Sequence, residues 1–174
     1  PNTLYGTAKL TQTIIAKQQS DYYDISTRVA RLFLPFGAFD HPGRVFSLVV
    51  DALRSNKSID LSPCTQKRDF IGINDVCDAY LRMAKDLDRT NFDIFNICSG
   101  EATELRHFLK MIANELNADH TLLNFGKISM RKGEGDLVLG ANKKAHEILG
   151  WSTQNLTQML TEELQFIDHV KRNL

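Results

Sequence analysis

The chain alternates between stretches in which apolar residues recur every three or four positions and shorter stretches that are apolar nearly throughout. The first pattern places apolar side chains on one face of an α-helix, and the second is typical of a buried strand. Asn74 or Asp75 is expected near the N-cap of one helix, and Gly150 at the C-terminal stop of another. Helical spacing predicts helices over residues 4–20, 45–55, 74–87, 141–149 and 156–170, and one more that opens at Thr103 or Glu104.

Strands are predicted over residues 27–34, 58–61, 92–98 and 122–125. The first is followed by Pro35 and Gly37, which break regular structure, so a loop is expected there. The stretch 118–140 is the least regular and holds the most closely spaced charges. Strands that alternate with helices predict an α/β fold with some parallel pairing, and the length of 174 residues favours one domain.

The chain carries 21 basic and 21 acidic side chains, so its formal net charge is zero. A balanced charge argues against a nucleic-acid-binding protein, which usually shows a clustered basic excess. No apolar run approaches the roughly 18 residues that a membrane helix needs, and no signal-peptide pattern opens the chain. Cys64, Cys77 and Cys98 are widely spaced and fit a reducing compartment better than a disulfide framework. These features predict a cytoplasmic globular protein with neither nucleic acid nor membrane as partner.

Tyr5 and Lys9 are the first residues with candidate chemistry. Four positions apart on a helix, their side chains share a face. An ammonium group beside a phenol favours the ionised oxygen, which makes a tyrosine usable as a proton donor or acceptor near neutral pH. For the bare pair, an exposed helix turn without function is the simpler interpretation.

The motifs that follow Tyr5 and Lys9 favour a functional interpretation of the pair. They come in the order RLFLPFG (31–37), QKRDFIGINDV (66–76), FNICSGE (95–101), RKGE (131–134) and LGW (149–151). Together with Tyr5 and Lys9, they resemble the extended short-chain dehydrogenase/reductase family, in its nucleotide-sugar epimerase, dehydratase and ketoreductase branch, over essentially the whole chain. The resemblance implies that residues 1–40 are the last elements of a doubly wound Rossmann-type fold. Residues 41–174 would mainly form a small mixed α/β lobe that binds a nucleotide sugar.

The resemblance also implies a catalytic role for Tyr5 and Lys9, which match the family's Tyr-x-x-x-Lys pair. Tyr5 would pass a proton to or from a sugar hydroxyl or keto oxygen while hydride moves to or from a nicotinamide. Lys9 would also bind the nicotinamide ribose, and Pro35 would lie against the nicotinamide. The expected cofactor is therefore NAD or NADP, with Tyr5, Lys9 and Pro35 as its contacts in this chain.

The implied substrate is a nucleoside-diphosphate sugar. Leu34 stands where UDP-galactose 4-epimerases have a substrate-contacting asparagine, so this chain lacks that polar contact. Arg68 matches a diphosphate-binding arginine, and Arg131 and Glu134 match an Arg-x-x-Asp pair whose acid binds ribose hydroxyls. Arg44 falls where many relatives carry a basic residue near the phosphates. A guanidinium fork suits phosphate oxygens, although each arginine taken singly is also explained as a solvated surface charge.

Other patterns are less informative. The five histidines are isolated from one another, so no metal site is expected. Gly133 and Gly135 resemble the start of a dinucleotide fingerprint, but Val138 stands where the third glycine belongs. Trp151 is expected to serve packing.

In the family, a glycine-rich strand–turn–helix and a catalytic serine or threonine precede the tyrosine. The chain is therefore expected to be the C-terminal part of an enzyme of ~300 residues, and to be inactive alone. Relatives commonly dimerise through the Tyr-x-x-x-Lys helix, so residues 4–20 are expected to form a homodimer contact. The alternative is a non-catalytic sugar-nucleotide-binding or assembly protein that lacks the cofactor lobe. The motifs look closest to those of CDP- or dTDP-linked deoxysugar reductases and epimerases.

Overall fold

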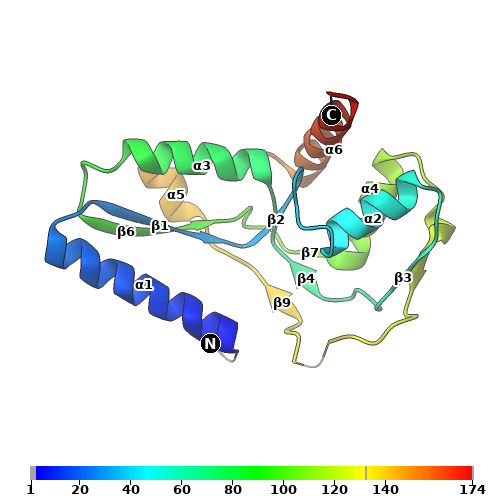
Figure 1. The fold of residues 1–174 in the computed structure, drawn as a ribbon, viewed down its shortest axis with the longest axis horizontal. Coiled ribbons are helices and arrows are strands. Elements are labelled where there is room, and N and C mark those ends of the chain that lie inside the picture. The colour runs from blue at the N-terminus through cyan, green and yellow to red at the C-terminus, as the bar shows by residue number, and fades with distance from the viewer. Residues whose placement is uncertain (1–2, 132, 174) are drawn as a thin grey trace.

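Short parallel strand pairs flanked by helices form the frame of the molecule (Figure 1). The computed structural model describes residues 3–131 and 133–173. The parallel pairs are β1 (Thr27–Leu32) with β6 (Phe92–Ile97), β2 (Leu34–Phe36) with β5 (Phe70–Gly72), and β3 (Ile59–Leu61) with β8 (Leu123–Phe125). The α/β class and the parallel pairing predicted from the sequence are therefore confirmed.

A three-stranded sheet joins segments that are far apart in the sequence. β4 (Lys67–Arg68) lies between β7 (Thr103–Glu104), to which it is antiparallel, and β9 (Leu137–Val138), to which it is parallel. These strands are two residues long. The sequence did not predict β4, β5, β7 or β9, because strands this short carry no periodic signal.

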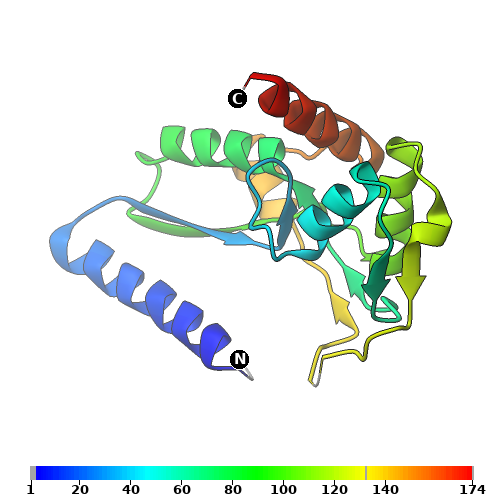
Figure 2. The same cartoon turned by 45° about the vertical axis from the view of Figure 1, so that its right-hand side comes forward.

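The helices cover the strands from two sides. α1 (Leu4–Tyr23) lies along one face of the β1–β6 pair and α3 (Ile73–Lys85) along the other, with α5 (Lys143–Leu149) beside α3 (Figures 1 and 2). At the opposite end of the molecule, α2 (Val45–Arg54) packs against α4 (Leu105–Glu115), and η1 (His120–Leu122) follows α4. α6 (Leu156–Asn173) contacts both β5 and α4.

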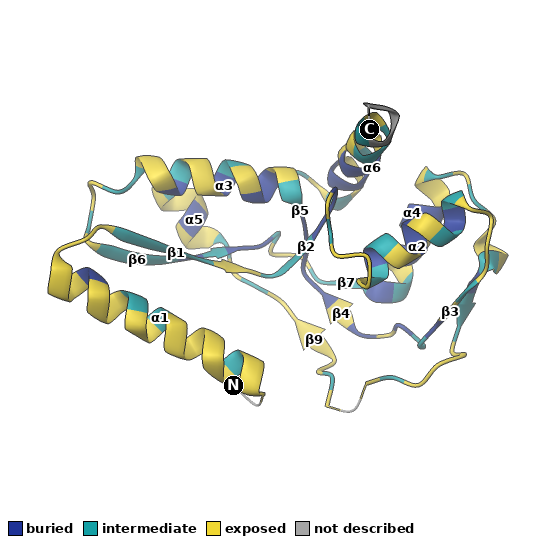
Figure 3. Ribbon diagram, in the orientation of Figure 1, coloured by how far each residue is buried: buried dark blue, intermediate teal, exposed yellow. Residues whose placement is uncertain are grey.

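The hydrophobic core lies where α2, α4 and α6 meet β2 and β5 (Figure 3). Phe70 and Phe108 stack with their ring centroids 4.0 Å apart, and Phe36 meets Phe108 edge to face. Aromatic pairs of this kind contribute beyond the area that they bury. α1 differs sharply, because Ser20 is its one buried residue. Its position therefore rests on few contacts.

The predicted strand over 27–34 is interrupted at Phe33. The Phe33 amide donates to the Ile97 carbonyl at 3.3 Å, whereas the Leu34 amide donates to the Asp69 carbonyl at 3.0 Å. The chain thus changes partner from β6 to β5 within one residue. This change carries it from the β1–β6 pair toward the core.

Several predicted helix boundaries are corrected by the structure. α1 continues past Ser20 to Tyr23, and Asp24 ends it in the left-handed conformation. α3 begins at Ile73 with Gly72 as its N-cap residue, so Asn74 and Asp75 lie in its first turn, near the N-cap as predicted. Gly150 ends α5 with φ 59°, as predicted.

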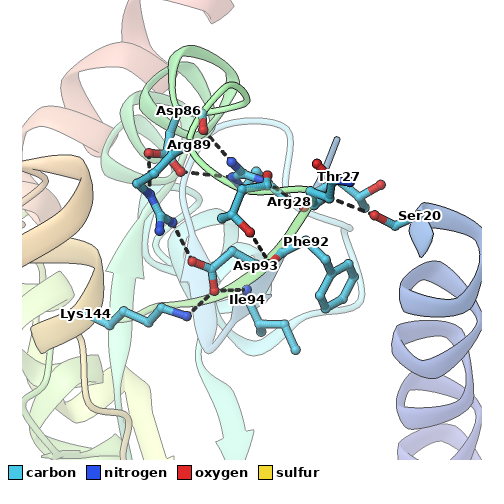
Figure 4. Close-up of polar contacts among 11 residues, drawn as sticks. Ser20, Thr27, Arg28, Asp86, Arg89, Phe92, Asp93, Ile94 and Lys144 are labelled. Atoms are coloured by element: carbon cyan, nitrogen blue, oxygen red, sulfur yellow. Dashed lines mark hydrogen bonds and ion pairs between the residues drawn. The ribbon is translucent and has the colours of Figure 1, made fainter. Parts of the chain in front are cut away.

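A network of charged side chains joins the C-terminal end of α3, α5 and the amino ends of β1 and β6 (Figure 4). The Arg28 side chain is 3% exposed and its Nε lies 2.9 Å from Asp86 Oδ2. Arg89 pairs with both Asp86 and Asp93, and Lys144 of α5 pairs with Asp93. The Ser20 hydroxyl donates to the backbone beside this network, which ties the C-terminal end of α1 to the strands.

Candidate functional site

Tyr5 and Lys9 line a groove between α1 and β1. The groove has a volume of about 710 Å³, and residues 27–32 of β1 form its other wall, with Tyr80 beside them. Tyr5 is 73% exposed. Lys9 Nζ lies 5.7 Å from the centroid of the Tyr5 ring and donates to Gln12 Oε1 at 3.2 Å. The predicted pair is thus together on one open face, with the ammonium group beside the phenol ring.

The end of β2 brings three more predicted residues together. Leu34, Pro35 and Arg44 share the lining of a small cavity of about 20 Å³, which Asp40 also lines. A larger cavity of about 160 Å³ is lined by Pro35, Arg44 and the loop that contains Phe39. Arg44 is the N-cap residue of α2, and its Nη1 lies 3.1 Å from Asp40 Oδ1. The loop therefore holds one cation beside the proline implied to meet the nicotinamide.

Arg68 and Glu134 form an ion pair across 66 positions of sequence. Arg68 Nη2 lies 2.8 Å from Glu134 Oε1, and the Arg68 side chain is 9% exposed. The second arm of the guanidinium, Nη1, donates to the Lys67 carbonyl at 2.8 Å. Gln66 Nε2 donates to the same Glu134 oxygen at 3.1 Å. In this geometry Arg68 holds Glu134 in place instead of presenting both arms to a ligand.

Arg131 lies in the same turn as Glu134, whose amide donates to the Arg131 carbonyl at 3.3 Å. Among the described residues, the Arg131 side chain makes no hydrogen bond or ion pair, and it is exposed. The pairing of β4 with β9 brings this turn toward Arg68, because Lys67 donates to the Asp136 carbonyl at 2.7 Å. Arg131 is thus a cation of this turn that is available to a ligand.

Asp69 organises this end of the strands, and the sequence reasoning missed it. Its side chain is fully buried. Oδ1 accepts hydrogen bonds from the amide and the hydroxyl of Ser99, each at 2.7 Å. Oδ2 accepts from the amides of Gly100 and Gly140 at 3.0 and 3.1 Å. In the sequence, two features could have indicated the role of Asp69: its position next to Arg68 and the small residues that follow β6.

A second buried carboxyl, Asp75, lies at the start of α3. Its Oδ2 accepts the Gln154 amide at 3.1 Å, and its backbone carbonyl accepts the indole N–H of Trp151 at 3.0 Å. Burial raises the pKa of Asp75, and the hydrogen bond from Gln154 offsets only part of that effect. Trp151 is fully buried, which confirms its predicted packing role.

Two of the three cysteines, Cys64 and Cys98, are buried. Burial raises the pKa of Cys98 to about 12, so this group stays a thiol and is a poor nucleophile. Burial also raises the pKa of Cys64. Within residues 3–131 and 133–173, no three His, Cys, Asp or Glu side chains are grouped so that they could hold a metal ion. Nor is any helix in those ranges long and apolar enough to cross a membrane.

Solved structures with similar folds were found for essentially the whole chain. MoeE5 in complex with UDP-glucuronic acid and NAD matches with a TM-score of 0.85 and 24% identity, over 100% of this chain and 57% of that chain. The dTDP-glucose 4,6-dehydratase of Bacillus anthracis, in complex with NAD, matches with a TM-score of 0.82 and 18% identity, over 99% of this chain and 54% of that chain. The chain thus has the α/β fold of Rossmann-like epimerase and dehydratase structures.

Sequence comparison leads to the family. The model of the NAD dependent epimerase/dehydratase family matches residues 1–98. This chain therefore belongs to that family, which confirms the family inferred from the motifs. It is 29% identical over 142 residues to CDP-abequose synthase of Salmonella muenchen, covering 81% of this chain and 46% of the relative. It is 24% identical over 165 residues to GDP-6-deoxy-D-mannose reductase of Pseudomonas aeruginosa, covering 88% and 52%. The chain spans about half the length of these curated relatives.

Proposed function

We propose that this chain is the nucleotide-sugar-binding part of an NAD- or NADP-dependent epimerase, dehydratase or ketoreductase. Residues 1–40 would complete the dinucleotide-binding fold, and residues 41–174 would mainly bind the nucleotide sugar. The observation that carries the proposal is the position of Tyr5 and Lys9 on one open groove along β1, in a chain of this family.

The groove suits the nicotinamide end of such a cofactor. Its volume of about 710 Å³ leaves room for a ring and a ribose, and Lys9 Nζ supplies donors for ribose hydroxyls. Bound there, the nicotinamide would accept or deliver a hydride. Tyr5 would hold or take up the proton at its phenolic oxygen, and the positive charge of Lys9 would stabilise that oxygen when it is ionised. Pro35, at the end of β2, would bound the nicotinamide site.

The nucleotide sugar would lie against the residues at the ends of β2, β4 and β9. Glu134, held by Arg68 and Gln66, presents carboxylate oxygen that can accept ribose hydroxyls. Arg131 and Arg44 would meet the diphosphate, since both guanidinium groups reach the surface. Leu34 would provide an apolar contact. The relatives named above act on CDP- and GDP-linked sugars according to their names, so the base is left to experiment.

The proposal includes a homodimer formed through residues 4–20. In α1, the side chains of Leu4, Leu10, Ile14 and Ile15 lie on the half of the helix that faces away from the groove. Leu4 is 91% exposed and Ile14 is 60% exposed. An exposed apolar face of this kind is typical of a helix that packs on a partner. Sedimentation equilibrium should show a dimer that Ile14→Glu dissociates, and a wild-type monomer at micromolar concentration would contradict this part of the proposal.

Titration calorimetry tests nucleotide binding directly. CDP, dTDP, UDP and GDP are titrated into the chain, and one of them is expected to bind. Arg131→Ala should weaken that binding about tenfold, the loss expected for one charge-assisted contact. Arg68→Ala should also weaken it, because Glu134 loses its anchor. Arg82→Ala on α3 is the matched control and should leave the affinity unchanged.

Failure of all four nucleotides to bind would contradict the proposed site in this chain. Turnover is a separate question. We expect no turnover of a sugar nucleotide with NAD or NADP by the 174-residue chain. Within the described residues β1 is paired on one edge only, so the sheet that would bind the cofactor is incomplete. Measurable turnover would overturn that expectation.

A further inference from the structure

Glu163 is a buried carboxyl that the proposed function does not use. It lies on α6 and is 1% exposed. Its Oε1 accepts the Asn74 amide at 2.9 Å, and its Oε2 accepts the Ala38 amide at 3.3 Å. No Lys, Arg or His side chain in residues 3–131 or 133–170 forms an ion pair with it. Its partners are therefore backbone amides rather than a cation.

The two amides belong to segments that follow neighbouring strands. Ala38 opens the loop after β2, and Asn74 lies in the first turn of α3, which follows β5. The N-cap residue of α3, Gly72, has no side chain to satisfy the free amides of that turn. Glu163 takes this capping role from a different helix. A carboxylate at this place is also favoured by the positive end of the helix dipole.

A second residue of α6 supports the same connection. Met159 lies one helical turn before Glu163, and its Sδ accepts the Gly72 amide at 3.1 Å. The carboxyl ends of β2 and β5, which pair in parallel, are thus both bound by one face of α6. In this way α6 reaches the loop that carries the predicted binding residues.

The loop itself needs to be held. Gly37 has φ 148°, and a Cβ at this position would collide with Glu163 Oε2. A residue with a side chain therefore does not fit at position 37 beside this carboxyl group. Two residues later Phe39 has φ 61°, a conformation that bulky side chains rarely adopt, and its ring is 81% exposed. Strain of this kind persists only where the surroundings over-determine the backbone.

We propose that Glu163 is a positioning residue, which fixes the loop 37–44 against the start of α3 by binding the Ala38 and Asn74 amides together. The loop begins after Pro35 and ends at Arg44, so Glu163 sets where these two residues stand relative to the ends of β2 and β5. The expected effect on ligand affinity rests on the proposed function, whereas the fixation of the loop by Glu163 is independent of it.

The carboxyl group suits this task because it has two acceptor oxygens and no donor. Burial raises the pKa of Glu163, while the amides of Asn74, Ala38 and Ile73 favour the ionised form and offset part of that effect. Glutamine has nearly the same shape, but its NH₂ group would face one of the two amide donors. Glu163→Gln therefore removes one of the two connections without changing the volume of the side chain. Glu162→Gln, at the exposed neighbouring position, is the matched control.

Amide hydrogen exchange measured by NMR tests the proposal. In the wild-type chain, the Ala38 and Asn74 amides should exchange slowly. In Glu163→Gln, at least one of them should exchange about tenfold faster or more, the change expected for loss of one buried hydrogen bond. The amides of Ala79 and Leu109, in helices of the core, should keep their wild-type rates, and Glu162→Gln should change none of the four.

Three results would overturn the proposal. The first is fast exchange of Ala38 in the wild-type chain, which requires no variant to fold. The second is an unchanged rate for both amides in Glu163→Gln. The third is an equal acceleration of all four amides, which would show a general loss of stability instead of a role at the loop.

The effect on a ligand is measured separately, with whichever of CDP, dTDP, UDP and GDP binds the wild-type chain. Glu163→Gln is expected to weaken that binding about fivefold while the amides of Ala79 and Leu109 stay protected. Weak amide protection at Ala38 with unchanged affinity would keep the loop fixation and overturn its link to binding. If none of the nucleotides binds the wild-type chain, the proposed function fails, whereas the exchange rates still decide the role of Glu163.

Discussion

The two ends of the parallel strands hold their carboxyl groups in different ways. At the amino ends of β1 and β6, Asp86 and Asp93 are paired with Arg28, Arg89 and Lys144 (Figure 4). At the carboxyl ends of β2, β4 and β5, Glu163 binds backbone amides, and Asp69 binds backbone amides and the Ser99 hydroxyl. All four carboxyl groups are satisfied, but among the described residues Asp69 and Glu163 form no ion pair with a cation.

The pKa directions follow this difference. For Asp86 and Asp93, burial opposes ionisation, but hydrogen bonds and charges from Arg89, Arg28 and Lys144 outweigh it and lower the pKa. For Glu163 and Asp75, burial dominates and raises the pKa. Ion pairs join one element to another, whereas carboxyl groups that bind amides fix loops. The first end therefore serves stability, and in the function proposed above the second end places the binding site.

The largest expected effect comes from breaking the charge network at the amino end. Arg28→Met keeps the aliphatic volume but leaves Asp86 and the Thr90 carbonyl without their buried partner. Removing one partner of a buried pair costs about 3 kcal/mol. Urea unfolding should show a loss of that size. Lys143→Met, which breaks an exposed pair with Glu147, should cost about 0.5 kcal/mol or less. Equal losses in the two variants would remove the distinction between the two ends.

At the carboxyl end, Asp69→Asn tests a carboxyl that binds amides. The asparagine NH₂ would face amide or hydroxyl donors, so at least one buried donor loses its acceptor. A loss of about 2 kcal/mol in the free energy of unfolding is expected. Asp88→Asn, on the exposed surface, should change it by about 0.5 kcal/mol or less. A loss as small as that of the control would mean that these amides do not depend on the carboxylate.

Acid unfolding distinguishes the two ends, because lowered and raised carboxyl pKa values change stability with pH in opposite directions. Because the folded pKa values of Asp86 and Asp93 are lowered, their contribution is fully present above the ordinary carboxyl pKa of about 4 and is lost as the pH falls through the folded values. Replacing both by asparagine should make stability less sensitive to pH between about pH 4 and 2, by roughly 1 kcal/mol. The raised pKa values of Glu163 and Asp75 act in the opposite direction, since their contribution decreases as the pH rises through the folded values. An equally steep acid transition in the double variant would show that the ion pairs add no stability.

The smallest effect on stability is expected for Arg44→Gln. The Arg44 side chain is 42% exposed and its pair with Asp40 lies at the surface. The free energy of unfolding should change by about 0.5 kcal/mol or less, while the affinity for the bound nucleoside diphosphate should drop several-fold. A larger change in the free energy of unfolding than in the free energy of binding would show that Arg44 serves stability, as the charged residues at the amino ends of β1 and β6 do.

Local patterns along the chain were sufficient for much of this fold. The apolar spacing of residues 45–55 predicted α2 to within one residue of its end, and the spacing after Glu104 predicted α4 and its start to within two residues. The four-residue separation of Tyr5 and Lys9 placed both on one helix face, and the structure confirms that they line the same groove. Gly150 ended its helix as predicted. In each case the residues that determine the feature lie within a few positions of it in the sequence.

The remaining features depend on residues that are distant in the sequence. Arg68 and Glu134 meet because the two-residue strands β4 and β9 pair, and neither strand has a signal of its own. Asn74 lies near the N-cap of α3 as predicted, yet the acceptor of its amide is Glu163, 89 positions further along the chain. The sequence by itself determined the helices, the strands β1, β3, β6 and β8, and the family, through periodicity and ordered motifs. Only the tertiary structure decided which carboxyl group meets a cation and which meets an amide, because that choice depends on long-range pairing and not on residue type.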